Sequence, residues 1–130
     1  AYGKSKDINE KQLKNSGKNF VILRLASVYG YSTDTARIDI MANFFAKTAS
    51  QNGTLRLFAA GKQIKSLVPL IDVARCFKFM EEREDINQEL FNLSKDTVTV
   101  KEVADICKKH NPNNLPSLII IKIQTIIRHI

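Results

Sequence analysis

The feature that most constrains the fold is a short, almost continuous apolar run at residues 20–25, Phe-Val-Ile-Leu-Arg-Leu. A run of this kind is typical of a parallel strand that is covered on both faces. A helix rich in Lys, Glu, Gln and Asn is predicted before it at residues 2–14, and Gly17 can take the left-handed conformation of a helix stop. Together these features predict an α/β architecture.

Helical and extended patterns alternate along the rest of the chain. Further helices are predicted at residues 38–50, 72–82 and 100–109, further strands at residues 54–58, 67–71 and 90–93, and a loop at residues 27–37. Asp72 is placed to act as the N-cap of one helix. Thr99, with Glu102 three residues later, predicts a capping box at the start of the last helix.

Composition narrows the class of protein. The chain of 130 residues is 44% apolar and 25% charged, which is ordinary for a globular domain and unlike a disordered one. The net charge of +7 comes from scattered lysines, and this favours solvated lysine faces over a nucleic-acid surface. Cys76 and Cys107 form no CxxC pair and no His stands at metal-ligand spacing, so we expect buried thiols in a reducing cytoplasm and no metal.

The two ends of the chain suggest a piece of a longer protein. It opens on Ala1 and Tyr2, without an initiating Met or a signal peptide. Residues 113–130 form an atypical, Ile-rich tail, which is too short and too interrupted to span a membrane. The tail is either an edge strand or an artefact at the end of a fragment, and we favour the artefact. Residues 1–112 are then the part with a recognisable organisation.

A Tyr-x-x-x-Lys pair and four ordered motifs after it carry a resemblance to a known family. Tyr2 and Lys6 form a Tyr-x-x-x-Lys pair, and residues 23–30, Leu-Arg-Leu-Ala-Ser-Val-Tyr-Gly, follow about twenty residues later. This order resembles the NAD-dependent epimerase/dehydratases, extended short-chain dehydrogenases that act on nucleotide sugars and carry Leu-Arg-Pro-x-Asn-x-Tyr-Gly. The remaining similar segments are residues 37–45, the family's substrate-domain helix; residues 65–74, its Arg-x-hydrophobic-Val-His-Val-x-Asp-Val-Ala; and residues 90–94 with 99–103, its last core strand and following helix.

The resemblance implies a fold and a reaction. The fold would be the C-terminal portion of a Rossmann-type doubly wound parallel sheet plus the small substrate-binding subdomain. The N-terminal Rossmann half, with its glycine-rich loop and the Ser or Thr of the catalytic triad, would lie upstream of residue 1. The reaction would be hydride transfer at a sugar carbon, with NAD (or NADP) as cofactor, Tyr2 as the base and Lys6 as its assistant.

The spacing of Tyr2 and Lys6 suits that role. Residues four apart on a helix share one face, about 5 to 6 Å apart at Cβ. A free tyrosine has a pKa near 10, so a tyrosine that acts as a base at neutral pH needs a nearby positive charge. The alternative is a solvated surface pair. The cofactor-binding residues implied by the resemblance are Tyr2, Lys6, Leu25 and Ser27, and the substrate-binding residues are Ser27, Asn43 and Lys65.

The sequence also departs from the family pattern. Leu25 replaces the family's Pro, Ser27 its Asn, Lys65 its phosphate-facing Arg, and Pro69 its His. Lys lacks the two-pronged fork of Arg, so Lys65 is a weaker match to a diphosphate. Asn43 and Lys65 could equally be a polar helix residue and a solvated lysine. Arg24, inside an apolar strand, is interpreted first as the partner of a carboxylate.

Two functional classes therefore remain. The first is a fragment of a cytoplasmic sugar-nucleotide epimerase or dehydratase, inactive alone, whose substrate is a nucleotide-activated sugar and which binds neither nucleic acid nor membrane. Its full-length parent could form a homodimer, as the family often does through the Tyr-x-x-x-Lys helix. The second is a small basic module that binds nucleic acid or another polyanion, and a non-catalytic relative of the enzymes is a further alternative.

Overall fold

The structure is a computed structural model that describes residues 1–32 and 36–110. The predicted tail at residues 113–130 and part of the predicted loop, residues 33–35, lie outside the described residues. In chain order the elements are α1 (Tyr2–Lys14), β1 (Val21–Leu25), β2 (Ser27–Tyr29), α2 (Met41–Ser50), the 3-10 turn η1 (Phe58–Gly61), β3 (Ile64–Pro69), α3 (Leu70–Glu81), β4 (Glu89–Leu93), β5 (Asp96–Thr99) and α4 (Val100–Lys109).

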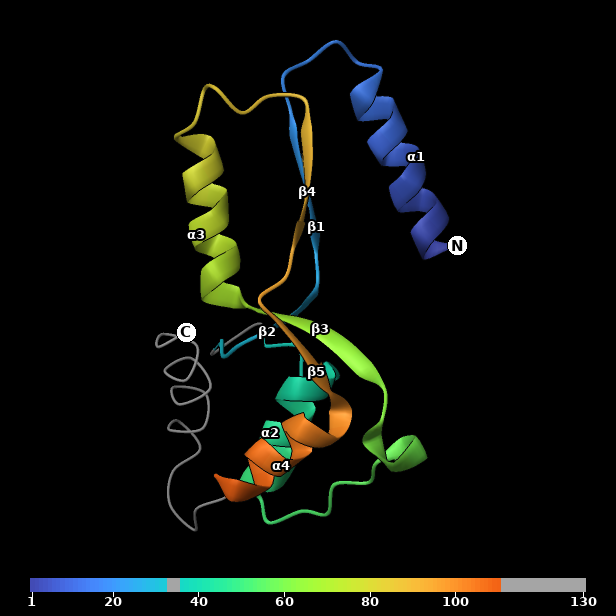
Figure 1. The fold of residues 1–130 in the computed structure, drawn as a ribbon, viewed down its shortest axis with the longest axis vertical. Coiled ribbons are helices and arrows are strands. Elements are labelled where there is room, and N and C mark those ends of the chain that lie inside the picture. Colours follow the sequence, from blue (N-terminus) through green and yellow to red (C-terminus); the bar gives the residue numbers. More distant parts are fainter. Residues whose placement is uncertain (33–35, 111–130) are drawn as a thin grey trace.

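These elements form two units joined by a narrow waist (Figure 1). The upper unit holds α1, α3 and a two-stranded parallel sheet of β1 and β4, in which Leu23 stands opposite Phe91. The lower unit holds α2, η1, α4 and a three-stranded sheet in the order β2-β3-β5, in which β2 is parallel and β5 antiparallel to β3. The parallel pairs β1–β4 and β2–β3 confirm the predicted α/β class with parallel strands.

The buried core belongs to the lower unit. It consists of Tyr29, Ala42, Phe45, Ala46, Ala49, Leu67, Val100, Val103, Ala104 and Cys107. Small side chains such as Ala46 and Ala104 let α2 and α4 lie close together. The predicted capping box of α4 is confirmed, since the Thr99 hydroxyl accepts a hydrogen bond from the Glu102 amide and the Glu102 carboxylate accepts one from the Thr99 amide.

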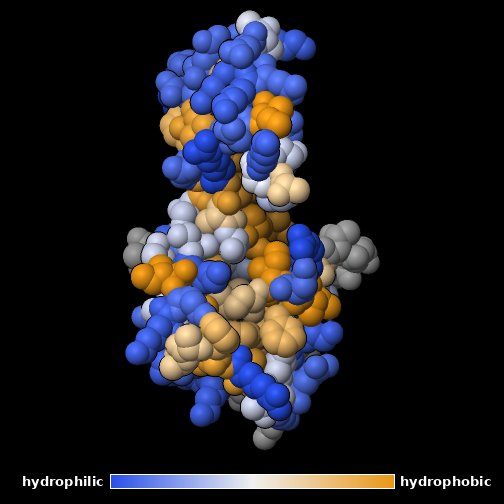
Figure 2. Space-filling view, turned by 90° about the vertical axis from the view of Figure 1, so that its right-hand side faces the viewer, coloured by the Kyte–Doolittle hydropathy of each residue, from blue (hydrophilic) through white to orange (hydrophobic). Residues whose placement is uncertain are grey.

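The upper unit is much less covered. Among the residues that the structure describes, Val73 is the buried apolar residue of the upper unit, and helix α1 contains no buried residue. Leu25, Phe77, Phe79 and Phe91 are exposed, so the predicted covering of residues 20–25 on both faces is absent within the described part of the chain. Figure 2 shows hydrophobic residues gathered at the waist and continuing onto the lower unit. A sheet of two strands has too small an apolar face to be stable by itself.

Several predicted boundaries are wrong. Residues 54–57 form no strand. The alternation of apolar and polar residues there arises because Leu55 and Leu57 both pack against the core of the lower unit, although this segment pairs with no other strand. The predicted strand at 67–71 ends at Pro69, because the fixed φ of proline suits both the last strand position and the residue before a helix. Pro69, and not Asp72, is therefore the N-cap of α3, and Asp72 lies within the first helical turn.

Candidate functional site

The predicted catalytic pair lies at the start of α1. The Lys6 ammonium nitrogen is 5.4 Å from the centre of the Tyr2 ring, so both side chains share one face of the helix, as predicted. That face is open, since Tyr2 is 78% exposed. The helix forms because residues 2–14 contain good helix formers, with Lys11 and Lys14 in its last turn where the helix dipole favours positive charge.

An ion pair attaches α1 to the sheet. Two nitrogens of the Arg24 guanidinium donate to the two carboxylate oxygens of Glu10, at 2.9 and 2.7 Å. The hydrogen bond from Arg24 lowers the pKa of the Glu10 carboxyl. This geometry confirms that Arg24 is the partner of a carboxylate, and it holds α1 beside β1 (Figure 1).

Leu25 and Ser27 flank the point where the chain passes from β1 to β2. Both are exposed, and the amide of Ala26 between them donates to the carbonyl of Leu93 at 2.9 Å. They lie at the carboxyl ends of the parallel strands β1 and β4. Ligands of open α/β sheets bind at this edge of the sheet.

Asn43 on α2 uses its side-chain amide within the protein. Its oxygen accepts a hydrogen bond from the Gly30 amide at 3.1 Å, and its nitrogen donates to the Arg37 carbonyl at 2.9 Å. Asn43 therefore fixes both ends of the connection between β2 and α2. Its predicted contact with substrate stays a prediction.

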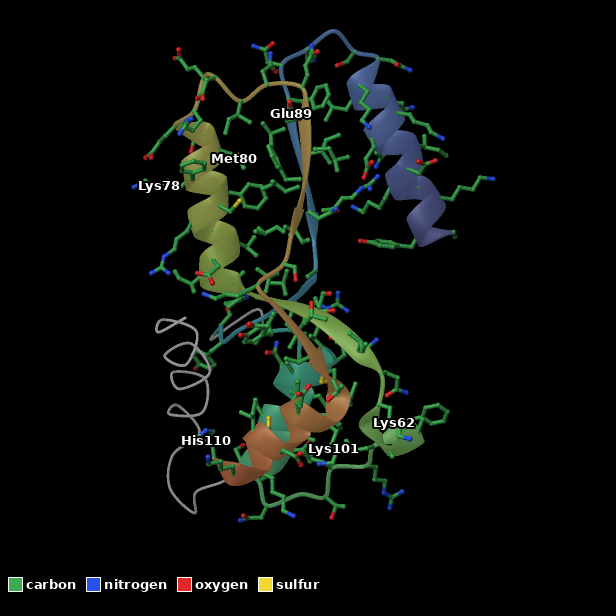
Figure 3. The ribbon with its side chains drawn as sticks, in the orientation of Figure 1. Lys62, Lys78, Met80, Glu89, Lys101 and His110 are labelled. Atoms are coloured by element: carbon green, nitrogen blue, oxygen red, sulfur yellow. The ribbon has the colours of Figure 1, made fainter. Side chains whose placement is uncertain are left out.

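Lys65 lies on β3, exposed and opposite Val98 of β5. The structure thus brings Tyr2 together with Lys6, and Leu25 together with Ser27. Asn43 and Lys65 belong to the lower unit, separated from α1 by the waist (Figure 1). Other lysines of the lower unit, Lys62 after η1 and Lys101 at the start of α4, extend from its outer surface (Figure 3).

Sequence reasoning missed the polar contacts at the waist. The Asp72 carboxylate accepts hydrogen bonds from Lys95 at 3.3 Å and from Arg75 at 3.2 Å. The buried Tyr29 lies near it, and its pKa is raised by burial and by the charges of Asp96 and Asp72. The spacing of Asp72 and Arg75 on one helix was the available local signal. Lys95 follows a strand end and had no such signal.

Neither a metal site nor a membrane span emerges from the described residues. No group of three or more His, Cys, Asp or Glu side chains there could hold a metal ion. No helix in the same part of the chain has the length and apolar character to cross a membrane.

This arrangement of elements also occurs in solved structures of UDP-glucose 4-epimerases. UDP-glucose 4-epimerase of Thermotoga maritima, solved with UDP-glucose, superposes with a TM-score of 0.70 at 24% identity, over 83% of this chain and 36% of that one. The Bordetella bronchiseptica enzyme WbmG, solved with NAD and UDP, gives 0.68 at 22% identity, over 88% of this chain and 34% of that one. The chain folds like part of a UDP-glucose 4-epimerase.

A third solved structure has the same fold. UDP-glucose 4-epimerase of Thermus thermophilus, solved with NAD, gives a TM-score of 0.65 at 18% identity over 82% of this chain. This chain spans about a third of the length of each of these three proteins, between 34 and 36%. No protein-family model and no curated protein sequence matches the chain.

Proposed function

We propose that this chain is the part of an NAD-dependent nucleotide-sugar epimerase or dehydratase that carries the catalytic helix and the substrate-binding unit. The observation that carries the proposal is the contact of Lys6 with the Tyr2 ring on an open helix face. It occurs within a fold that superposes on UDP-glucose 4-epimerase of Thermotoga maritima with a TM-score of 0.70. The lower unit corresponds in this proposal to the substrate-binding subdomain.

Tyr2 acts as the general base in the proposed mechanism. Its phenolic oxygen takes the proton of a sugar hydroxyl, and the Lys6 ammonium stabilises the negative charge of the phenolate that does so. The chemistry that NAD would supply there is acceptance of the hydride from the same sugar carbon. Leu25 and Ser27, at the carboxyl edge of the β1–β4 sheet, would also contact the cofactor.

The residues of this chain fit one end of the dinucleotide. Tyr2 and Lys6 offer a hydroxyl and an ammonium to the nicotinamide ribose. The five glycines, at positions 3, 17, 30, 53 and 61, are too far apart in sequence to build the glycine-rich turn that holds a pyrophosphate. We therefore propose that the pyrophosphate is held by a segment other than these 130 residues. The same segment would determine whether the cofactor is NAD or NADP.

The substrate would be a nucleotide diphosphate sugar. Lys65 supplies a positive charge for the diphosphate, and Ser27 supplies a hydroxyl near the waist. Asn43 would contribute by holding the loop around Gly30 and Arg37, because its amide already bonds to both ends of that loop. The exposed α1 is the surface through which two such enzymes would pair.

A chimera tests the proposal. Residues 2–110 would replace the matching part of the Thermotoga maritima epimerase, and conversion of UDP-glucose and other UDP-sugars would be measured beside a Tyr2→Phe chimera. We expect turnover that Tyr2→Phe abolishes. Thermal melting and retained NAD would report whether each chimera is folded. A folded chimera that holds NAD but is as slow as its Tyr2→Phe counterpart on every sugar would contradict the proposal.

Binding experiments on the 130-residue chain alone distinguish the proposed enzyme part from a basic module that binds polyanions. We expect no micromolar binding of NAD in a calorimetric titration, because the pyrophosphate turn is absent. A polyanion-binding module would instead bind an oligonucleotide with an affinity that falls steeply with added salt. Such binding, with a cooperative melt, would favour the basic module.

A further inference from the structure

The waist is crossed by three separate parts of the chain. Ala26 connects β1 to β2, residues 69–70 connect β3 to α3, and residues 94–95 connect β4 to β5 (Figure 1). Any rotation of one unit against the other must change the backbone at all three places. What binds these crossings to one another therefore sets the angle between the units.

Backbone hydrogen bonds join the crossings in pairs. The amide of Ala26 donates to the Leu93 carbonyl, and the amide of Lys95 donates to the Leu67 carbonyl, both at 2.9 Å. Val68 and Pro69 are fully buried beside them. These contacts hold the strands side by side at the waist.

One side-chain contact joins α3 to the connection between β4 and β5. Asp72 lies in the first turn of α3, and its carboxylate accepts a hydrogen bond from the Lys95 ammonium at 3.3 Å, across 23 residues of sequence. The side chains of Asp72 and Lys95 are only 22% and 32% exposed, whereas in pairs such as Lys11–Asp7 and Lys101–Asp105 both partners are more than 50% exposed. Partial burial makes such a pair less sensitive to solvent screening than a surface pair.

Arg75 orients the same carboxylate. It donates to the other oxygen of Asp72 at 3.2 Å from one turn further along α3. With one oxygen directed to Arg75 and the other to Lys95, the carboxylate has a defined orientation. The contact therefore constrains the direction of α3 relative to the β4–β5 connection, and not merely their proximity.

We infer that Asp72 is a positioning residue, which together with Lys95 fixes the angle between the upper and lower units. On the proposed function, that angle sets the separation between the Tyr2 and Lys6 face and the substrate residues of the lower unit. This consequence rests on the proposed function. The angle itself does not, because it is a property of the chain without cofactor or substrate.

Residual dipolar couplings of the backbone amides in the 130-residue chain measure that angle directly. In the unsubstituted chain we expect one alignment tensor to fit the amides of both units. In Lys95→Met, where Asp72 keeps its Arg75 partner, we expect each unit to fit its own tensor while the couplings within each unit keep their pattern. Asp72→Asn should give the same loss of common alignment, and Lys95→Arg should restore it.

Asp105→Asn is the matched control. It removes an ion pair with Lys101 inside α4, away from the waist, and should leave the single tensor unchanged. A single tensor in Lys95→Met as well would overturn the inference. So would a common alignment that is lost equally in Asp105→Asn, since the effect would then come from charge alone. None of these outcomes depends on whether the chimera turns over a UDP-sugar, so failure of the proposed function would be seen separately.

Discussion

The Lys6 ammonium lies 5.4 Å from the centre of the Tyr2 ring, one helical turn away on α1. In this position the cation faces the aromatic ring of Tyr2. The pair is formed entirely within one exposed helix. Its geometry therefore does not depend on the packing of the rest of the chain, and substitutions at either position test chemistry with little effect on folding.

In the chimera that turns over a UDP-sugar, Tyr2→Phe should lower kcat by roughly 100- to 10,000-fold, the usual contribution of a general base. NAD should remain bound with nearly unchanged affinity, because Lys6 still contacts the ribose and the aromatic ring of residue 2 is kept. Lys6→Ala should lower kcat and also weaken NAD binding, since Lys6 is proposed both to stabilise the Tyr2 phenolate and to bind the nicotinamide ribose. Steady-state kinetics and cofactor titration separate these effects. Turnover of Tyr2→Phe within threefold of the parent would show that Tyr2 is not the base.

Gly61→Ala should destabilise the chain by about 3 kcal/mol. Gly61 has a φ of +70°, and an added Cβ would lie 2.8 Å from the backbone nitrogen of Lys101 at the start of α4. Chemical denaturation measures the loss. Gly3→Ala is the control, because Gly3 lies in helix α1 and nothing lies within 4 Å of the added Cβ. This substitution should be neutral or slightly stabilising. Equal stabilities of the two variants would show that η1 can move away from α4.

The capping box of α4 should make stability depend on pH. Hydrogen bonds from the Thr99 amide and hydroxyl lower the pKa of Glu102 below its ordinary value of 4.5. A carboxyl whose pKa is lower in the folded state stabilises the fold above the unfolded pKa, and this contribution is lost as pH falls through the folded pKa. Thr99→Ala should cost about 1 kcal/mol at neutral pH.

The contribution of the capping box to this pH dependence is isolated by comparing thermal melts of the unsubstituted chain and of Glu102→Gln between neutral pH and pH 3. Other carboxyls with lowered pKa values, such as Asp7 and Asp39, contribute to both curves and cancel in the difference. The difference in melting temperature should shrink as the solution becomes more acidic. A constant difference would mean that the folded chain does not stabilise the charged form of Glu102.

The two cysteines should differ in reactivity. Cys107 on α4 is fully buried in the core of the lower unit, and burial raises the pKa of its thiol to about 11. Cys76 is half-buried on α3. At pH 8 iodoacetamide should label Cys76 readily and Cys107 only when the lower unit opens, because the thiolate is the reactive form. Mass spectrometry of the labelled peptides reads this directly, and equal labelling rates would contradict the packing of α4.

Helices with local signals could be predicted from the sequence. The helix of residues 100–109 was predicted with its observed bounds, because Thr99 and Glu102 form the cap from within one turn. The helix of residues 2–14 was predicted equally well from its composition. The strand at residues 20–25 was within one residue of β1, since its apolar run is continuous.

Short strands could not be predicted, because their pairing is non-local. β2 has three residues and β5 has four, and each exists by pairing with β3, where Ser27 stands opposite Leu67 and Thr97 opposite Ser66. For the site, the i, i+4 spacing predicted the Tyr2 and Lys6 face. The bonds of Asn43 to Gly30 and Arg37 depend on how a loop returns to a helix, which no sequence pattern in that segment encodes.

The uneven distribution of the core has a consequence for how the chain resists proteases. Ten packed residues stabilise the lower unit, whereas α1 has no buried side chain and is held to β1 by the Arg24–Glu10 pair. Segments with few buried contacts open with little free energy, and cleavage follows opening. A protease would therefore remove the helix with Tyr2 and Lys6 first and leave α2, α4 and the β2-β3-β5 sheet as the resistant remainder. The part of the molecule proposed to perform chemistry is thus the part most readily separated from the part proposed to recognise substrate.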